Sequence, residues 1–589
     1  MASLYLHKNA DINLEVEILA KHIIEFLSTK NNLKTVSVNG LLLHSKYDPI
    51  KEANRIVEKE FEPNFAYLLF GFGLGYIKNA LMEKIGDPSK IVIIDPIFSL
   101  LNNDILSHQV IERVNEKEIE TYIADRLPHL SKKIKVVCSP NYEKIFPNEY
   151  KMVLQIIKNV QMLNLVNENT VRYFADSWQE NAIHNLVNVY TGISLEVLNK
   201  YYTCPVVVAA GGPSLTKQLP LLKEIEKNVI LIAAGSTVNS LLKNEIEPDY
   251  IVTVDGSLAN YNHFKDIGKI KSKLLFAITS NYKIQYEFKN EKYAFVDANN
   301  VEYREQIKKL FDVNLPLIYG GGSVANFCYS IANYITTGPI AMIGQDLAYT
   351  HNKSHDESNK HFIEIDDNVK KERRTFELEG YYGDKVLTDY SFLSMKKGFE
   401  ILHYHNTNDN EIYNCTEGGV KIEGIEQLPF RAFVEGFVDR SNIINMEMEI
   451  KRRKADYNTF YGIMNRKIRK YDDVIKEIKN AIILLKTNSS MIYFDKKVLR
   501  GLEKVDAKLK KAFIELSIEY ITGPISIDVL RNYEQIPNEK PVESYKRVFN
   551  QNLELYTRLL EVIEKSKCYT LEATKESENL FSEDENDGK

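Results

Sequence analysis

The chain lacks an excess of basic residues, a long apolar run and a secretion signal. Its 75 Lys and Arg against 81 Asp and Glu leave a formal net charge of −6, so it does not have the basic surplus expected of a nucleic-acid-binding protein. No apolar run approaches about 20 residues, which excludes a membrane-spanning helix. The first 20 residues have no basic segment followed by an apolar stretch and a cleavage site, so we expect no signal peptide and a cytoplasmic location.

Cysteine and several common catalytic motifs are also scarce or missing. The five cysteines are scattered and form no CxxC or Cys/His ligand spacing, so reduced, buried thiols are expected. The sequence has no GxSxG, HExxH, P-loop GxxxxGK[ST] or EF-hand pattern. These absences remove several common enzyme classes.

What is present is a chain of 589 residues with 44% hydrophobic and 26% charged content, which suits a soluble protein of three or four domains. We expect an N-terminal α/β domain over 1–190 and a central domain over 191–430, which ends in a polar flap from residue 351. The region 431–573 has the spacing of long amphipathic helices. The tail 574–589 is acidic and poor in apolar residues, so we expect it to be disordered.

The N-terminal domain contains one glycine-rich loop. A short apolar strand ends at Phe70 and leads into Gly71-Phe72-Gly73-Leu74-Gly75, and a second strand ends at Asp95, 20 residues after Gly75. An acid at this spacing holds a ribose in many nucleotide-binding folds. The alternative is that the glycines only let a helix pack closely on a strand.

The central region alternates apolar strands with amphipathic helices, which predicts a doubly wound, Rossmann-like parallel sheet in an α/β protein. The expected strands are Val206–Ala210, Val229–Ala233, Tyr250–Val254, Leu274–Thr279 and Ile340–Ile343. Small or polar residues follow each of them. Because the carboxyl ends of parallel strands share one edge of the sheet, we expect these loops to build one ligand site.

Two glycine-rich helix starts are candidates for binding a phosphate. The first is Gly211, Gly212, Pro213 and Ser214, where glycine permits close approach and backbone N–H groups can face an anion. The second is Gly320-Gly321-Gly322-Ser323, ahead of an apolar helix stripe; here Gly322 and Ser323 are the predicted contacts. The alternatives are a plain strand-to-helix turn for the first and a connector capped by serine for the second.

Two carboxylates and two histidines complete the candidate site. Asp255, followed by Gly256, and Asp346 each come directly after a strand. Asp255 could bind a ribose, a substrate amine or a divalent cation, or it could only cap the loop that follows it, and the two carboxylates together would suit Mg²⁺. His351 and His355 lie just beyond Asp346, where a neutral imidazole can accept a proton from an attacking hydroxyl. We therefore assign His351, His355 and Asp346 as catalytic candidates, and Gly211–Ser214, Asp255, Gly256, Gly322 and Ser323 as nucleotide-binding candidates.

These segments together resemble a known family, the motility-associated (Maf) flagellin glycosyltransferases. Their central domain is shared with archaeal 6-hydroxymethylpterin pyrophosphokinases of the MptE type, and it resembles that of bacterial sialyltransferases. The resemblance is carried by AAGGPSL at 209–215, VTVDGS at 252–257, GGGSVANF at 320–327 and IGQDLAYT at 343–350. Further segments at 44–53, 68–81 and 414–425 extend it over most of 40–430.

The resemblance implies a CMP-activated nonulosonic acid donor, such as pseudaminic or legionaminic acid, and flagellin Ser/Thr hydroxyls as acceptors. By likeness to the sialyltransferases, the transfer should invert the anomeric centre and need no metal to bind the donor. The catalytic histidine of those enzymes lies in a loop that does not align cleanly here, so the choice between His351 and His355 stays open.

Two other interpretations stay open. A pterin pyrophosphokinase would transfer a pyrophosphoryl group from ATP, with Asp255 and Asp346 holding Mg²⁺. A flagellin-binding protein without activity would keep the nucleotide fold but not bind CMP. Cofactors other than the donor, including Mg²⁺, are not fixed by the sequence.

Overall fold

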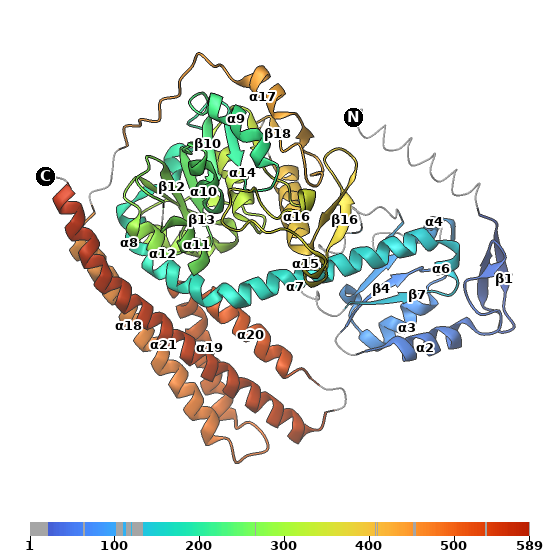
Figure 1. The fold of residues 1–589 in the computed structure, drawn as a ribbon. Helices are drawn as coiled ribbons and strands as arrows, with labels where there is room; N and C mark the ends of the chain where they lie inside the picture. The colour runs from blue at the N-terminus through green and yellow to red at the C-terminus, as the bar shows by residue number, and fades with distance from the viewer. Residues whose placement is uncertain are drawn as a thin grey trace. The chain divides into compact units, whose positions relative to one another are not determined.

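The computed structural model of the chain describes residues 22–62, 65–101, 110–112, 119, 134–265, 267–406, 408, 410–450, 455–535 and 539–587. The chain forms two compact units, residues 1–168 and 169–589, which we call the N-terminal unit and the second unit. The boundary differs from the expected division at residue 190. The reason is helix α7 (Pro147–His184), which is continuous, so that its carboxyl half belongs to the second unit (Figure 1).

The N-terminal unit is built on a four-stranded parallel sheet in the order β6-β5-β4-β7. The strands are β4 (Ala66–Phe70), β5 (Ile91–Ile94), β6 (Val110–Ile111) and β7 (Ile134–Cys138). All five residues of β4 are buried because apolar clusters cover both of its faces. Helices α2 (Pro49–Glu60) and α3 (Tyr76–Ile85) pack on one face of this sheet. The unit also contains a small antiparallel sheet, formed by β1 (Ile24–Ser28), β2 (Lys34–Val38) and β3 (Leu41–Leu42). The expected Rossmann-like α/β unit is confirmed.

The second unit contains the predicted doubly wound sheet, in the order β14-β13-β12-β11-β10-β9-β15-β18-β19, with β8 (Ile193–Ser194) pairing β13. Every pairing in it is parallel. The strands are β9 (Val206–Ala209), β10 (Ile230–Ala234), β11 (Tyr250–Thr253), β12 (Lys273–Ala277), β13 (Lys292–Asp297), β14 (Leu317–Ile318), β15 (Ile340–Ile343), β18 (Ile412–Asn414) and β19 (Glu426–Gln427).

Alternation along these strands divides the core into two layers. Val207 and Ala209 of β9 face one apolar cluster, whereas Val206 and Val208 face the other. Helices cover both faces (Figure 1): α9 (Leu215–Ile225), α10 (Gly235–Lys243), α11 (Leu258–Phe264), α12 (Tyr282–Glu287), α13 (Val301–Phe311) and α14 (Val324–Ile335). The chain runs outward from β9 to β14, returns through α14, and adds β15 on the other side of β9. This reversal creates a topological switch point between β9 and β15, where ligands bind in open α/β sheets.

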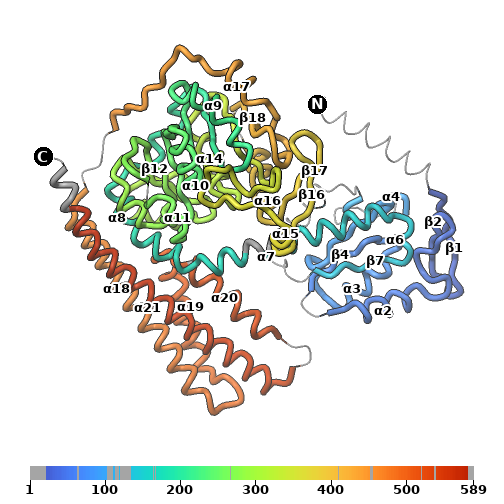
Figure 2. The backbone as a smooth tube through the Cα atoms, in the orientation of Figure 1, coloured from blue at the N-terminus to red at the C-terminus, as the bar shows by residue number. Residues whose placement is uncertain are grey.

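The segment after β15 is irregular up to residue 366 apart from the 3-10 helix η4 (Thr350–Asn352), as expected for a flap. It then forms α15 (Asp367–Arg373), the hairpin β16 (Phe376–Glu379) and β17 (Lys385–Thr388), and α16 (Tyr390–Tyr404). α17 (Phe430–Phe437) follows β19. The carboxyl-terminal region is helical, with α18 (Tyr457–Thr487), α19 (Lys496–Leu516), α20 (Glu519–Asn532) and α21 (Pro541–Asp587) around a common apolar cluster. α18 and α21 lie side by side along their length (Figure 2).

The expectation of a disordered tail from residue 574 is wrong for the part of the tail that the structure describes. α21 continues to Asp587, with Thr574 and Ser577 buried. Leu580 and Phe581 pack against the core of the central sheet, and the Phe581 ring lies 5.9 Å from that of Phe460. The acidic composition concealed this apolar face, because tertiary packing rather than hydrophobicity of the whole segment stabilises such a helix end.

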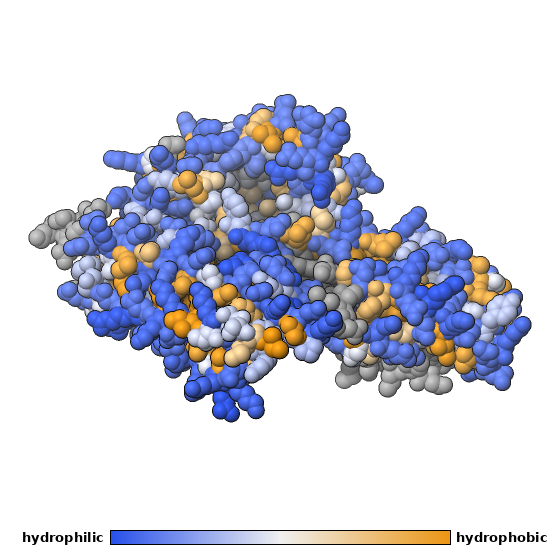
Figure 3. Space-filling model, turned by 90° about the horizontal axis from the view of Figure 1, so that it is seen from below, coloured by the Kyte–Doolittle hydropathy of each residue, from blue (hydrophilic) through white to orange (hydrophobic). Residues whose placement is uncertain are grey.

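No helix within the described ranges has the length and apolar content needed to cross a bilayer. On the face of the molecule shown in Figure 3, hydrophobic residues lie in separate patches among hydrophilic ones. The cysteines of the described residues are all free. Cys328 and Cys415 are buried as expected, whereas Cys138 and Cys204 are partly buried and Cys568 is exposed.

Candidate functional site

The loops that follow β9 and β15 meet at the switch point. The amide of Gly212 donates to the carbonyl oxygen of Gly344 over 2.8 Å. A Cβ on Gly212 would lie 2.2 Å from Oδ1 of Asp346 and 2.5 Å from that carbonyl oxygen, so only glycine fits. The glycine at this position is therefore required first of all by contact between the two loops.

The buried side chain of Asp346 connects these two loops. Its Oδ1 accepts from the amide of Ser214 (3.0 Å), and its Oδ2 accepts from the hydroxyls of Ser214 (2.6 Å) and Thr350 (2.7 Å). The side chain is 1% exposed, and burial raises its pKa. With both oxygens engaged, Asp346 is placed to hold the Gly211–Ser214 loop in position rather than to face a ligand.

Gly211 is covered by side chains of the flap. The amide of Asp356 donates to the carbonyl oxygen of Gly211 over 3.0 Å. A Cβ on Gly211 would lie 3.0 Å from Nδ2 of Asn359, 3.3 Å from Oγ1 of Thr237 and 3.9 Å from the His355 ring. The buried hydroxyl of Thr237, at the start of α10, has no hydrogen-bond partner among the described residues. The flap thus brings His355 to the first glycine of the predicted phosphate loop.

The structure separates the two histidines that the sequence left open. His351 is exposed, with a backbone φ of +55°. His355 is partly buried, and its Nδ1 lies 3.1 Å from Oγ of Ser354. Burial and, secondarily, the neighbouring His361 lower the pKa of His355, which keeps its imidazole in the neutral form that accepts a proton.

His355 is part of a wider imidazole cluster. Its ring centroid lies 6.1 Å from that of His361, and Nε2 of His361 lies 3.2 Å from Nε2 of His263, on α11. Burial, followed by the charge of His361, lowers the pKa of His263. The sequence did not single out His263 because 98 residues separate it from His361.

The loop after β11 carries Asp255 and Gly256. Asp255 is partly buried, and its Oδ1 accepts from the amide of Ser257 over 2.8 Å, which fixes the turn. A Cβ on Gly256 would lie 2.7 Å from Nδ2 of Asn181 and 3.0 Å from the ring of Trp178, both on α7. Contacts of α7 with this loop were not predicted from the sequence.

At the start of α14, the alternative role of a capping serine is observed. Oγ of Ser323 accepts from the amide of Asn326 (3.2 Å) and donates to Oδ1 of the same residue (2.6 Å). A Cβ at position 320 would collide with the Phe327 ring, and one at position 321 would collide with the backbone of Gly398, on α16, so only glycine fits at either position. Gly322, with φ of +92°, meets only Ser394 Oγ, at 3.9 Å. Within this motif, Gly322 is the glycine with space beside it.

The N-terminal glycine loop is filled by side chains of its own unit. Asp95 is fully buried, and its Oδ2 accepts from the amides of Phe72 (2.8 Å) and Gly73 (3.1 Å) and from the hydroxyl of Tyr142 (2.8 Å). Burial raises the pKa of Asp95 to about 6. A Cβ on Gly73 would lie 2.5 Å from Nε2 of His44. These contacts favour the packing role of the glycines over a ribose site.

Across the residues that the structure describes, no group of three or more His, Cys, Asp or Glu side chains is arranged to hold a metal ion. Asp255 follows β11 and Asp346 follows β15, and the strands β10 and β9 lie between them in the sheet. The oxygens of Asp346 are engaged as described above.

Comparison with known proteins gives three matches. Residues 180–352, from the end of α7 to the start of the flap, match the family model described as 6-hydroxymethylpterin diphosphokinase MptE-like. An uncharacterized protein of Treponema pallidum (strain Nichols) is 21% identical over 206 residues, which are 33% of this chain and 70% of that protein. The solved structure of the MAf glycosyltransferase from Magnetospirillum magneticum AMB-1 superimposes with a TM-score of 0.51 and 13% identity. That superposition covers 95% of this chain and 92% of the other. The chain therefore has the fold of that glycosyltransferase, in agreement with the resemblance seen in its sequence.

Proposed function

We propose that this chain is a glycosyltransferase that moves a nonulosonic acid of the pseudaminic or legionaminic type from a CMP-activated donor to Ser/Thr hydroxyls of flagellin. The fold it shares with the MAf glycosyltransferase supports the class of reaction. The observation that carries the proposal is the position of His355, a partly buried imidazole that the flap holds against Gly211 at the switch point of the sheet.

In this proposal the donor lies across the carboxyl edge of the sheet. Gly211, Asp255, Gly256 and Gly322 line the places where the nucleotide and its phosphate approach the backbone. Gly212, Pro213 and Ser214 shape the first loop, since the amides of Gly212 and Ser214 already donate within the protein. Ser323 caps α14, whose amino terminus favours the negative charge of the leaving phosphate.

The reaction is a single displacement. The acceptor hydroxyl oxygen forms a bond to the anomeric carbon while the bond from that carbon to the phosphate oxygen of CMP breaks. The proton of the hydroxyl passes to His355, and the electron pair of the broken bond leaves with CMP. One displacement inverts the anomeric centre, and no step needs a metal.

A second candidate is a Mg²⁺-dependent pyrophosphoryl transferase, which the match to the MptE-like family model favours. It needs Asp346 to release its hydrogen bonds to Ser214 and Thr350 before it can hold a metal. Because those bonds also fix the Gly211–Ser214 loop, we rank this function second.

Titration calorimetry and mass spectrometry separate these functions. We expect the protein to bind CMP without added metal, and flagellin from cells that contain the protein to carry a nonulosonic acid that is missing when the protein is deleted. Binding of ATP only with Mg²⁺, with no CMP binding, would favour the pyrophosphoryl transferase. A flagellin complex with neither nucleotide bound would favour a binding protein without activity.

A further inference from the structure

The carboxyl half of α7 presents buried amide side chains to two loops of the candidate site. Nδ2 of Asn181 donates to the carbonyl oxygen of Gly256 (3.0 Å), and its Oδ1 accepts from the amide of Tyr282 (3.2 Å). One helical turn later, Nδ2 of Asn185 donates to the carbonyl oxygens of Ile278 (2.9 Å) and Ser280 (2.8 Å). The two asparagines thus bind the backbone of the loops that follow β11 and β12.

These asparagines are more than helix-packing residues. Asn181 is 2% exposed and Asn185 is fully buried. An apolar side chain would pack α7 on the sheet without the cost of burying an amide, and a buried amide stabilises only when its partners are fixed. Asn281, in the loop after β12, adds a further hydrogen bond, because its Nδ2 donates to the carbonyl oxygen of Gly256 over 3.2 Å.

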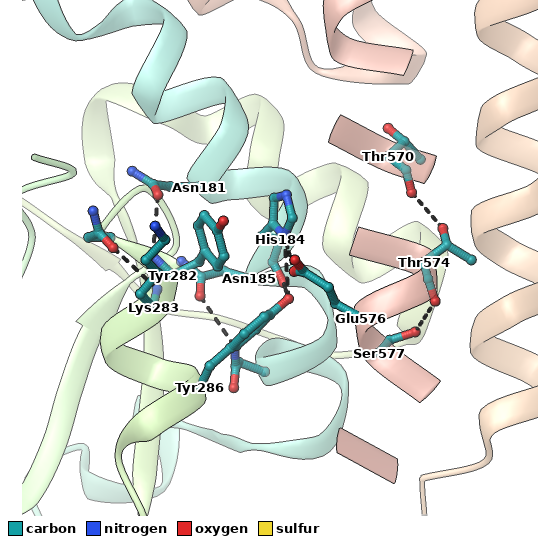
Figure 4. Close-up of polar contacts among 12 residues, drawn as sticks. Asn181, His184, Asn185, Tyr282, Lys283, Tyr286, Thr570, Thr574, Glu576 and Ser577 are labelled. Atoms are coloured by element: carbon teal, nitrogen blue, oxygen red, sulfur yellow. Dashed lines mark hydrogen bonds and ion pairs between the residues drawn. The ribbon is translucent and has the colours of Figure 1, made fainter. Parts of the chain in front are cut away.

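α21 holds this part of α7 from the other side (Figure 4). Nδ1 of His184 lies 2.9 Å from Oε2 of Glu576, and the His184 ring stacks on Tyr282 with 4.0 Å between ring centroids. His184 is 1% exposed, and within the described part of the chain its Nε2 has no hydrogen-bond partner. Burial, followed by the charge of Lys283, lowers the pKa of His184 to about 4, so the ring that contacts Glu576 is neutral.

The contacts form a continuous series from α21 to the site. Glu576 holds His184, His184 stacks on Tyr282, and the amide of Tyr282 is held by Asn181, which also holds Gly256. Asp255, a nucleotide-binding candidate, is the next residue, and its carbonyl oxygen accepts from the amide of Asn281 over 3.2 Å.

We propose that Asn181 is a positioning residue that sets donor affinity, by holding the Asp255–Ser257 loop in its binding conformation, and that Glu576 supports it through His184. The donor assignment in this proposal rests on the proposed function. Through these contacts, α21 affects the affinity for the donor.

Hydrogen exchange in the ligand-free protein tests the positioning without any assumption about the ligand. In Asn181→Ala, we expect the amides of Ser257 and Tyr282 to exchange at least about tenfold faster, because the bonds that hold their loops are lost. The matched control is Ser177→Ala, on the same helix, whose hydroxyl bonds only the carbonyl oxygen of Phe174. Equal exchange in the two variants overturns the proposal.

CMP binding tests the effect on the donor. Trp178 is the single tryptophan of the chain and lies against Gly256, so its fluorescence should change when CMP binds. We expect Asn181→Ala to raise the Kd of CMP by about five- to tenfold, the loss of one to two buried hydrogen bonds, and Ser177→Ala to leave it unchanged. In transfer assays, the KM for the donor should rise while the KM for the acceptor stays the same.

Glu576 offers a conservative rescue. Glu576→Ala should weaken CMP binding in the same direction as Asn181→Ala, because the contact with the His184 ring is lost. Glu576→Gln keeps a side chain of the same size against that ring and should restore CMP binding. Glu578→Ala, at an exposed position two residues along α21, is the control.

The outcomes are distinguishable. If the parent protein binds no CMP, the proposed function fails, and the exchange data alone decide whether the network positions the loop. If the parent protein binds CMP and Asn181→Ala binds it equally well, the proposal fails even when exchange is faster.

Discussion

At the scale of single residues, the proposed function makes His355, which lies beside Gly211, the general base. We expect His355→Ala to lower the rate of transfer by about 10²–10⁴-fold, with CMP affinity unchanged because the base acts on the acceptor hydroxyl. His351→Ala is the control, since that side chain is exposed. Steady-state kinetics with flagellin as acceptor measure both. Normal transfer by His355→Ala would move the search for the base to His361 and His263.

Gly211 tests how closely the flap covers the phosphate loop. The added methyl group of Gly211→Ala would lie 3.0 Å from Nδ2 of Asn359 and 3.3 Å from Oγ1 of Thr237, so flap and loop must separate by a few tenths of an ångström. We expect a folded protein whose Kd for CMP is about tenfold higher, as seen by calorimetry. Gly436→Ala, in α17, meets no atom within 4 Å and should bind CMP normally. An unchanged Kd in Gly211→Ala would remove Gly211 from the donor site.

At the scale of elements, the end of α21 contributes to stability. The ring centroid of Phe581 lies 5.5 Å from that of Tyr457 and 6.3 Å from that of Tyr190. We expect Phe581→Ala to lower the free energy of unfolding by about 1–3 kcal/mol, below the value for a fully buried phenylalanine. Denaturant unfolding measures it, with Leu571→Ala, at a 47% exposed position of the same helix, as the control. Equal stability of the two variants would return the tail to the disordered state expected from its composition.

The sequence predicted the five strands that are followed by glycine or by a polar residue, because a short apolar run bounded by such residues is typical of a buried strand in a parallel sheet. It missed β13, which begins with Lys292, and the strands of two or three residues, β8, β14, β18 and β19. The location of the site loops at one edge of the sheet was also predictable, since the carboxyl ends of parallel strands all lie at the same edge. The contacts of Asn181 with Gly256 were not, because 75 residues separate them. The pattern of Asn181 and Asn185 among Ala182, Ile183 and Leu186 does carry a signal, as two amides one turn apart on a buried helix face need backbone partners.

At the scale of the whole molecule, two compact units predict that a change confined to one unit alters the unfolding of that unit first. His44 allows this to be tested through pH. It is 2% exposed, and its Nε2 accepts from the amide of Leu74 over 2.9 Å, a bond that only the unprotonated nitrogen can make. Burial lowers the pKa of His44 to about 4.

The sign of the pH effect follows from this lowered pKa. In the unfolded chain, His44 binds a proton as pH falls through about 6.5, whereas in the folded unit it stays neutral down to about 4, so the N-terminal unit loses stability between these values. At about pH 5 the loss amounts to about 2 kcal/mol. Asp95, whose folded pKa is raised to about 6, acts in the opposite direction over part of this range, so a variant is needed to isolate His44. His44→Gln keeps an acceptor for the Leu74 amide but cannot be protonated. We therefore expect the stability advantage of the parent protein over His44→Gln to shrink by about 2 kcal/mol between about pH 7.5 and about pH 5, measured by urea unfolding of the N-terminal unit. A constant difference across this range would mean that His44 is protonated in the folded unit, and the hydrogen bond to Leu74 would have to be reassigned.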